Sequence, residues 1–446
     1  MSDLVQVFQA AACVFVIAAL AMPAGVGGGL LYVPLLLLVG VTSSANASAA
    51  LSQPIVVGGA LAANLFNFLW HLRHPGRRLV EPSLAVASIA PCLAGVTLGA
   101  LLNRTLPEVG ILALLVATIV WNLLNSIRKA VALWRRESLE KAAAAQPAPT
   151  AIGAETTCGR CPDHAQLKAE QAAPDSPYST YSVYAAEREE GAIRQRRPSS
   201  CDEETQVEFS TPGDVAATTC TPSSAGEPVS HSSKAPPMDA PPAGVREWLK
   251  LGGIWLFMLF MTVLRGGQGV SLFSTCSWQY WSVTVGSTVV LLLVGWRFRH
   301  PGISMPKCFG VGVLCAIVGI GGGLVLNPML LSLGVDAMRS TATVTVMMLM
   351  ICTSATLTFA MAGSIPMVPV AILSTASFLG SFAGKTLVGW VVSRTGRTSI
   401  LVFLLASFLT ISGLVVVGRG VKNSADAITS GRGSTLIQVH DLCASS

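Results

Sequence analysis

Two glycine-rich stretches are the residues of this sequence with the clearest capacity to bind a ligand. Residues 25–41 read GVGGGLLYVPLLLLVGV and residues 319–335 read GIGGGLVLNPMLLSLGV, and the two are identical at 10 of 17 aligned positions. Glycine weakens a helix by roughly 1 kcal/mol relative to alanine, so each cluster predicts a break inside an apolar segment. The N–H groups at the start of the helix that follows favour anions. The repeat therefore predicts a site for a small anion.

Glycine and proline interrupt both copies at the same places. Broken backbone inside a bilayer occurs only where protein or a water-filled cavity covers it, and matched interruptions in two halves are typical of transporter binding sites. The alternative is that the glycines only allow helices to pack closely, which is our interpretation of GVTLG at 95–99 and GSFAG at 380–384. We expect substrate contacts from both copies, at Gly25, Gly27, Gly28, Gly29, Pro34, Gly319, Gly321, Gly322, Gly323 and Pro328.

A helix with many polar side chains follows each copy. Its hydroxyl and amide groups can bond an oxyanion, although such groups also form ordinary bonds between membrane helices. The two copies differ where Val33 aligns with Asn327, so the site is expected to be asymmetric. An ionisable group inside a span is a functional hypothesis, with snorkelling to the interface as the alternative. The further candidates are Ser48, Ser52, Gln53, Asn327, Thr341, Thr345 and the intramembrane lysine Lys385.

The composition is that of a polytopic membrane protein. The chain has 446 residues, of which 52% are hydrophobic and 12% charged, whereas soluble domains carry roughly 25% charged residues. No run of basic residues interleaved with aromatic ones appears, so no nucleic-acid partner is expected despite the net charge of +6. The sequence GxxxxGK[ST] is absent, which argues against an ATP-driven pump. We expect no enzyme activity, cofactor or metal.

Apolar runs of spanning length predict an all-α fold with about ten membrane elements. A continuous helix over 5–39 would be about 50 Å long, while a bilayer core is roughly 30 Å, so this element must tilt or break. We expect this run to be retained in the protein, because it lacks the basic start of a signal peptide. The elements are expected at 5–39, 47–70, 80–102, 108–127, 248–264, 279–296, 307–333, 340–361, 366–390 and 398–418.

The spans group into two repeats with an even number of elements each, which predicts parallel copies related by an axis along the membrane normal. Basic clusters place the linker and both termini in the cytosol, of either the plasma membrane or an endomembrane. Arg339 and the basic residues at 103–105 and 393–397 are exceptions on the far side. The predicted parts are a first repeat at 1–134, a disordered cytosolic linker at 135–246, an extra hairpin at 247–300, a second repeat at 301–420 and a cytosolic tail at 421–446.

The linker is rich in Ala, Pro, Ser, Thr and Glu and is expected to be disordered. Its CGRC at 158–161 with His164 nearby is a weak zinc pattern, because a second cysteine pair is missing. RRPS at 196–199 has a form that a kinase can recognise and phosphorylate. A kinase or another cytosolic protein is therefore a candidate partner of this segment.

The element GxGGGLxxxPxLL, present twice and followed each time by a polar helix, resembles the sulfite exporter TauE/SafE family. SRTGRTSILVFLLASFLTISGLVVVG at 393–418 and CSWQYW at 276–281 resemble its plant and protist branch. The resemblance implies transport of small sulfur-containing or organic anions such as sulfite or sulfoacetate. The long linker and the unequal motif copies depart from the bacterial pattern.

These observations predict a secondary membrane transporter of a small anion, in which the two broken elements bind the substrate and alternate access to it. One alternative is an anion channel with the same site. The other is a membrane scaffold or receptor that acts through its disordered loop. The sequence predicts neither a coupling ion nor an oligomeric state.

Overall fold

The computed structural model describes residues 2–23, 25–73, 79–145, 244–266, 277–335 and 337–395, and further along the chain 407, 410, 411, 413–418 and 420. Within these ranges the secondary structure is helical and contains no strand. Seven of the helices are long and apolar enough to cross a membrane. The prediction of an all-α polytopic membrane protein is confirmed.

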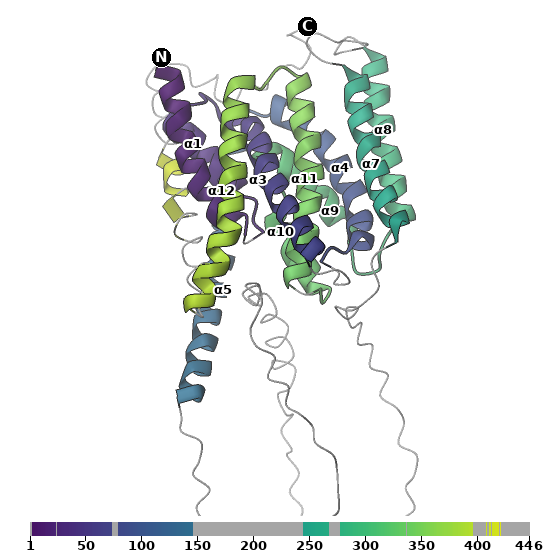
Figure 1. The fold of residues 1–446 in the computed structure, drawn as a ribbon. Coiled ribbons are helices and arrows are strands. Elements are labelled where there is room, and N and C mark those ends of the chain that lie inside the picture. The colour runs from purple at the N-terminus through teal and green to yellow at the C-terminus, as the bar shows by residue number, and fades with distance from the viewer. Residues whose placement is uncertain are drawn as a thin grey trace, which may run out of the picture.

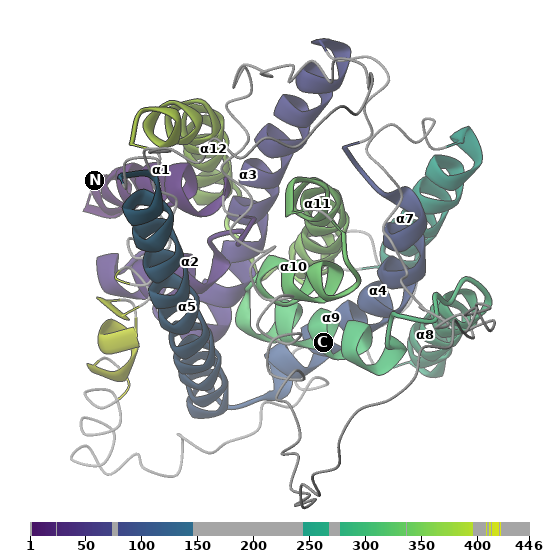
Figure 2. The same ribbon diagram turned by 90° about the horizontal axis from the view of Figure 1, so that it is seen from below.

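The helices follow one another through two halves separated by residues 146–243 (Figure 1). Seen from below, α3, α10 and α11 lie between α1, α2 and α12 on one side and α4, α7 and α8 on the other (Figure 2). Their bounds are α1 Ser2–Ala21, α2 Gly29–Val39, α3 Ala45–Arg73, α4 Pro82–Thr105, α5 Glu108–Ala145, α7 Val245–Arg265, α8 Trp278–Arg297, α9 Met305–Val318, α10 Gly323–Ser332, α11 Ala337–Met361 and α12 Met367–Thr395.

The first glycine cluster turns the chain back on itself. Gly25, Gly27 and Gly28 have φ angles of +71°, +81° and +67°, which favour glycine because it has no β-carbon. Helix α2 then returns beside α1, so that a β-carbon on Gly40, just after α2, would lie 3.8 Å from the side chain of Gln6. Helices α1 and α2 thus form a re-entrant hairpin, hereafter hairpin 1.

The second cluster forms the same turn. Gly319, Gly321 and Gly322 have φ angles of +80°, +76° and +80°. A β-carbon on Gly302, before α9, would overlap the side chain of Leu333, after α10, so the two helices begin and end at the same end of the bundle. Helices α9 and α10 form hairpin 2.

Each hairpin begins and ends at the same end of the bundle and so makes no net crossing, whereas each broken element was counted as one span from the sequence. Helices α2 and α10 have 11 and 10 residues, which at 1.5 Å per residue covers about half of a bilayer core of roughly 30 Å. The glycines do not merely interrupt a spanning helix, because successive left-handed residues reverse its direction.

The reversal makes the two repeats inverted, not parallel as predicted. Of the described helices, five (α3, α4, α5, α7 and α8) lie between the hairpins, and the ends of α5 and α7 that flank residues 146–243 lie at the same end of the bundle, so hairpin 2 enters from the end opposite to hairpin 1. Figure 1 shows the N-terminal end of α1 at the top of the bundle and α5 extending from its bottom. Such repeats are related by a pseudo-two-fold axis in the membrane plane.

The two ends of the bundle therefore carry different segments. The N-terminal end of α1 lies at one end, and the ends of α5 and α7 that flank the linker lie at the other. The prediction that the N-terminus and the linker share the cytosolic side is wrong, because hairpin 1 contributes no crossing. Arg339 and the C-terminal end of α12, which were exceptions to the charge pattern, now lie at the linker end.

The two GxxxG motifs pack each repeat against the hairpin of the other. A β-carbon on Gly95 in α4 would overlap the carbonyl group of Phe309 in α9, and one on Gly380 in α12 would overlap that of Phe15 in α1. The second glycine of each motif makes the corresponding contact one turn further. Phe15 and Phe309 are separated by 294 residues, as are the two glycine clusters, so the packing obeys the pseudo-symmetry. The interpretation of both motifs as helix packing is confirmed.

Two helices extend into the segment that was expected to be a linker, since α7 begins at Val245. Helix α5 continues to Ala145, beyond residue 135 where the linker was expected to begin. The CGRC and RRPS patterns and the tail at 421–446 lie outside the described residues, as does most of the element expected at 398–418.

Candidate functional site

The tips of the two hairpins cross at the centre of the bundle. A β-carbon on Gly29 would overlap the carbonyl oxygen of Gly319, and a β-carbon on Gly323 would overlap the carbonyl oxygen of Gly25. The two contacts are related by the shift of 294 residues, so the pseudo-two-fold axis passes between the tips. Any side chain at these two positions would push the hairpins apart, which is why the crossing requires glycine.

Backbone N–H groups remain available at this crossing. Among the described residues, no hydrogen-bond acceptor is found for the amides of Gly27 to Gly29 or of Gly321 to Gly323. All six glycines are buried, and the N-cap residues Gly28 and Gly322 provide no side chain to bond the first turn. Buried amides at helix starts require a ligand, water or side chain. The arrangement can therefore bind an oxyanion, as the glycine spacing predicts.

Three side chains from hairpin 2 and α11 surround the Gly25 tip. The amide of Asn327 lies 3.4 Å from the Gly25 carbonyl oxygen, to which it donates, while its own carbonyl oxygen accepts from Ser340 at 2.8 Å. A β-carbon on Gly25 would lie 2.9 Å from the methyl group of Thr341. Thr341 is only 4% exposed, and its hydroxyl has no partner among the described residues. Asn327 and Thr341 thus lie beside the first glycine turn, although both belong to the second half of the chain.

The Gly319 tip is held by α3. The Ser52 hydroxyl lies 3.0 Å from the Gly319 carbonyl oxygen and 2.7 Å from that of Ala49, and its single proton serves both. The Gln53 side chain donates to the carbonyl group of Cys315 in α9, and its own buried oxygen has no donor among the described residues. Both side chains lie at the crossing as predicted. Their donors are used on the backbone of hairpin 2, so they support the turn.

Ser48 does not reach the crossing. Its hydroxyl bonds the carbonyl oxygen of Ser44 at 3.0 Å and the hydroxyl of Thr42, all near the first turn of α3. These are the local bonds that serine forms at a helix start. Among the described residues the Ser48 hydroxyl thus has only local partners, and no bond from it to either hairpin is found.

Thr345 and Lys385 belong to one buried network on the linker side of the crossing. The Lys385 ammonium donates to the Asn67 side chain at 2.9 Å, and the Asn67 amide donates to the Thr345 hydroxyl at 3.3 Å. The backbone oxygen of Thr345 accepts from Asn64 at 2.9 Å. The lysine is 7% exposed and lies 5.5 Å from the ring of Phe66, so it points into the protein and does not snorkel.

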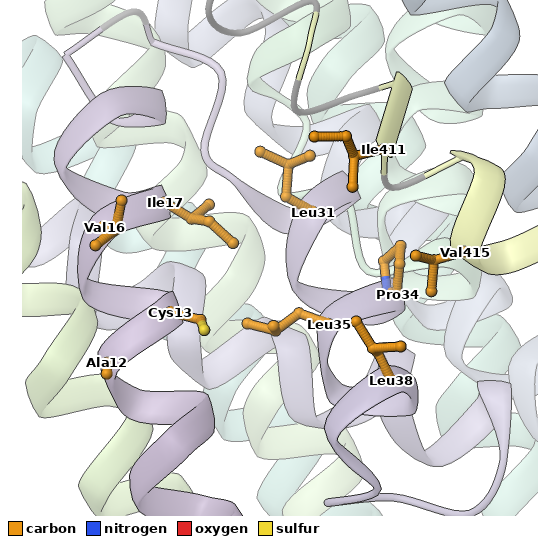
Figure 3. A pocket seen from close by; sticks show the side chains of 10 residues that line it. All are labelled: Ala12, Cys13, Val16, Ile17, Leu31, Pro34, Leu35, Leu38, Ile411 and Val415. Atoms are coloured by element: carbon orange, nitrogen blue, oxygen red, sulfur yellow. The ribbon is translucent and has the colours of Figure 1, made fainter.

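The two prolines differ in their surroundings. Pro328 follows Asn327 in α10, beside the Gly25 tip. Pro34 lines a groove of about 410 Å³ on the outer side of hairpin 1, and Figure 3 shows its ring beside Leu35 and Val415. The other lining side chains are apolar apart from the Cys13 thiol, so the groove offers no donors for an anion. The structure places Pro34 away from the predicted site.

Several polar residues at the site were not selected from the sequence. Asn103 of α4 donates to the carbonyl oxygen of Ile317 at 2.8 Å, and Asn46 donates to the Asn103 backbone at 2.6 Å. At the linker end, Arg339 pairs with Glu81 at 3.2 Å, and both side chains are buried. From the sequence, Arg339 was expected only as an exception to the charge pattern, and Glu81 was not selected. Their pairing joins segments 258 residues apart, which sequence spacing cannot show.

An all-helical bundle of inverted repeats, each with a re-entrant hairpin, defines the class of polytopic membrane transport proteins. The model of the sulfite exporter TauE/SafE family matches residues 10–158 and 245–411, and the chain belongs to this family. The resemblance drawn from the glycine motifs is therefore confirmed.

The comparison with curated proteins finds relatives in Arabidopsis thaliana. The chain is 25% identical to sulfite exporter TauE/SafE family protein 5, over 93% of this chain and 83% of the relative. It is 24% identical to family protein 1, over 95% of this chain and 86% of the relative. No solved structure matches the chain.

Proposed function

We propose that the protein is a secondary carrier of a small anion, either a sulfur oxyanion or an organosulfonate, and that it binds this anion where the two hairpins cross. Membership of a transporter family supports a transport role over catalysis. The substrate class is suggested by the names of the relatives, which are sulfite exporter family proteins.

The observation that carries the proposal is the crossing itself. Two helices, α2 and α10, begin there from opposite directions, and the six buried glycine amides have no acceptor among the described residues. Helix starts bind anions because their free N–H groups and the helix dipole both favour negative charge. An oxyanion with several acceptor oxygens satisfies more of these donors than a halide ion.

Alternating access follows from the inverted arrangement. Hairpin 1 enters from the end of the bundle that holds the start of α1, and hairpin 2 enters from the linker end. In inverted repeats, motion of one repeat against the other exchanges the end to which a central site opens. We infer that the anion leaves along hairpin 1 in one state and along hairpin 2 in the other.

Individual residues take different parts in this scheme. The glycine amides and the unpartnered Thr341 hydroxyl contact the anion, while Asn327, Ser52 and Gln53 hold the two turns in shape. The uncompensated oxygen of Gln53 is an acceptor and would repel an anion, so this side of the crossing has a supporting role.

The orientation follows from the basic residues. Arg73, Arg297 and Arg299 lie at the linker end of the bundle, and the cytosolic side carries the excess of Lys and Arg. We infer that the linker faces the cytosol and that the N-terminal end of α1 faces the opposite compartment.

The test is uptake of radiolabelled sulfite, sulfate and sulfoacetate into proteoliposomes that contain the purified full chain. Gly322→Leu should abolish saturable uptake, because this residue has φ +80° and a β-carbon there would lie 3.0 Å from the Cys315 sulfur. Gly253→Leu is the matched control, since a β-carbon at Gly253 meets nothing within 4 Å. Equal uptake by wild type and Gly322→Leu would disprove the site.

The alternatives give different results in the same vesicles. A channel would give flux that does not saturate and would not exchange external for internal anion. A scaffold would transport none of the three anions, and its function in cells would depend on residues 150–240 and not on Gly322. Saturable exchange that is unaffected by deletion of 150–240 supports the carrier.

A further inference from the structure

We propose that Lys385 restricts the transported substrate to monovalent anions. This inference rests on the proposed function, because it assumes that an anion binds at the hairpin crossing. It concerns the charge of the substrate, which the family membership does not specify.

The bonding of Lys385 is incomplete. A lysine ammonium has three N–H donors, and the contact with Asn67 at 2.9 Å satisfies one of them. The ring of Phe66, 5.5 Å from the nitrogen, provides a weaker cation–π contact. No carboxylate lies within ion-pair distance of this lysine among the described residues. The side chain is nevertheless buried, where α12 packs against α3.

The other buried charges do not compensate it. Glu81 is neutralised by Arg339 at 3.2 Å. Arg265 lies between α7 and α8, where it donates to Ser287 at 3.3 Å. Of the buried charged residues that the structure describes, Lys385 and Arg265 thus have no carboxylate partner, and Lys385 is the one that Asn67 joins to α11, the helix that contacts the Gly25 tip. An uncompensated charge inside a membrane protein is costly and marks a functional site.

A chain of contacts links the lysine to the crossing. Asn67 connects Lys385 to Thr345, and Thr341 lies one helical turn from Thr345 on the same face of α11. Thr341 in turn contacts the Gly25 tip. The lysine therefore acts on a bound anion through the field of its charge, which is weakly screened in a buried, low-dielectric region.

Charge balance then selects the substrate. A monovalent anion at the crossing cancels the single formal charge of Lys385, whereas a divalent anion exceeds it and leaves its second negative charge to the partial charges of the two helix starts alone. Desolvating such a charge is unfavourable. Hydrogensulfite and simple alkanesulfonates meet this requirement, and sulfate does not.

The test compares two anions of similar shape and different charge. Radiolabelled methanesulfonate and sulfate are offered to proteoliposomes of the wild-type chain at fixed pH and clamped membrane potential. Uptake of methanesulfonate should exceed that of sulfate at least tenfold. Lys385→Met should lower methanesulfonate uptake at least tenfold and remove the preference, while Lys385→Arg should keep it. Lys250→Met is the control, because Lys250 is exposed and pairs with Glu247.

The wild-type comparison decides the question even if Lys385→Met fails to fold. Sulfate uptake equal to methanesulfonate uptake, with both lost in Gly322→Leu, would overturn the inference and leave the proposed function standing. A preference for methanesulfonate that persists in folded Lys385→Met would also overturn it. Absence of uptake of every anion would refute the proposed function, and the inference with it.

Discussion

The two hairpins have the same backbone and different side-chain supports. Each has three glycines with positive φ, and each packs a glycine onto a carbonyl group of the other. The Gly25 carbonyl accepts from Asn327, which belongs to hairpin 2 itself, whereas the Gly319 carbonyl accepts from Ser52 of α3. Hairpin 1 is thus held by its counterpart, and hairpin 2 by a spanning helix.

The same contrast recurs at the start of the helix that follows each hairpin. The amide of Ala45, at the start of α3, donates to the Glu108 carboxylate at 3.2 Å. The aligned residue 294 positions later is Arg339, which forms the buried ion pair with Glu81. Symmetry is retained where backbone meets backbone, because only glycine fits there. It is lost in the polar contacts. We therefore expect that the free energy needed to open the site differs between the two ends of the bundle.

The comparison can be tested first at the level of topology, where the outcome is all or none. A cysteine added before Ser2 and one at Ser43 should be labelled by an impermeant maleimide from one side of the membrane. His300→Cys and Ser332→Cys should be labelled from the other side. The reason is that each hairpin begins and ends at the same end of the bundle. The variants are labelled in sealed vesicles after the native reactive cysteines have been replaced.

Labelling of the N-terminal cysteine from the same side as His300 would contradict the inverted arrangement. That result would mean that the segment over hairpin 1 crosses the membrane. The pair of positions at each hairpin serves as its own control, since both members must react together.

The glycines that touch the opposing hairpin should give the next largest effect. Gly29→Ala and Gly323→Ala each force a methyl group against a carbonyl oxygen that backbone geometry fixes. Such overpacking costs about 1–3 kcal/mol or more, and it separates the tips. Both variants should lose anion uptake almost completely, and to the same degree if the backbone symmetry governs function.

Gly252→Ala is the control for this pair, because a β-carbon there meets nothing within 4 Å. This change should stabilise α7 slightly, as alanine is the better helix former. Full uptake by either tip variant would show that the crossing is not closed as tightly as the glycine contacts indicate.

The location of the crossing could be predicted from the sequence, but the direction of the chain through it could not. Identical spacing of Gly25 and Gly319 relative to Pro34 and Pro328 identified a paired structural element. A glycine cluster permits both a break in a spanning helix and a full reversal, and composition does not distinguish them. Counting a hairpin as one membrane crossing gives each repeat an even number of crossings, whereas without it the number is odd. The predicted orientation of the second repeat and the predicted side of the N-terminus were therefore wrong.

The polar candidates had a mixed outcome for a related reason. Asn327 lies inside the second glycine motif and Thr341 follows it closely, but both contact the Gly25 tip of the other hairpin, a proximity that their positions in the sequence do not show. The bonds of Ser52 to Gly319 and of Asn103 to Ile317 join residues more than 200 positions apart and depend on which hairpin each helix packs against. The role of Ser48 at its own helix start shows that a serine beside a motif often satisfies local backbone.

The buried ion pair provides a test of the difference between the two helix starts. Glu81→Gln leaves the charge of Arg339 buried without its partner, and breaking such a pair costs about 3–5 kcal/mol. Thermal unfolding in detergent should therefore occur at a clearly lower temperature. Glu108→Gln removes a hydrogen bond to the amide of Ala45 and should cost only about 1 kcal/mol.

A second variant separates the pair from its surroundings. Glu81→Gln combined with Arg339→Met should recover most of the lost stability, because no unpaired charge remains. Equal destabilisation by Glu81→Gln and Glu108→Gln would contradict the contrast between the two ends.

The smallest effects are expected from the side chains that support the two tips. Asn327→Val removes the donor to the Gly25 carbonyl and also leaves the Ser340 hydroxyl without its shorter bond, at 2.8 Å. Leaving buried polar groups unsatisfied costs about 1–3 kcal/mol. Ser52→Ala removes one hydroxyl that the Gly319 and Ala49 carbonyl groups share, and should cost about 1 kcal/mol.

A reciprocal exchange of Val33 and Asn327 tests whether this aligned pair alone causes the difference between the two tips. Val33→Asn combined with Asn327→Val moves the amide to the aligned place in hairpin 1. The double variant should regain part of the stability only if the moved amide reaches the Gly319 carbonyl, which Ser52 already bonds. Because that acceptor is occupied, we expect little recovery in wild-type background and more when Ser52→Ala is added. Full recovery without Ser52→Ala would mean that the two tips are supported interchangeably.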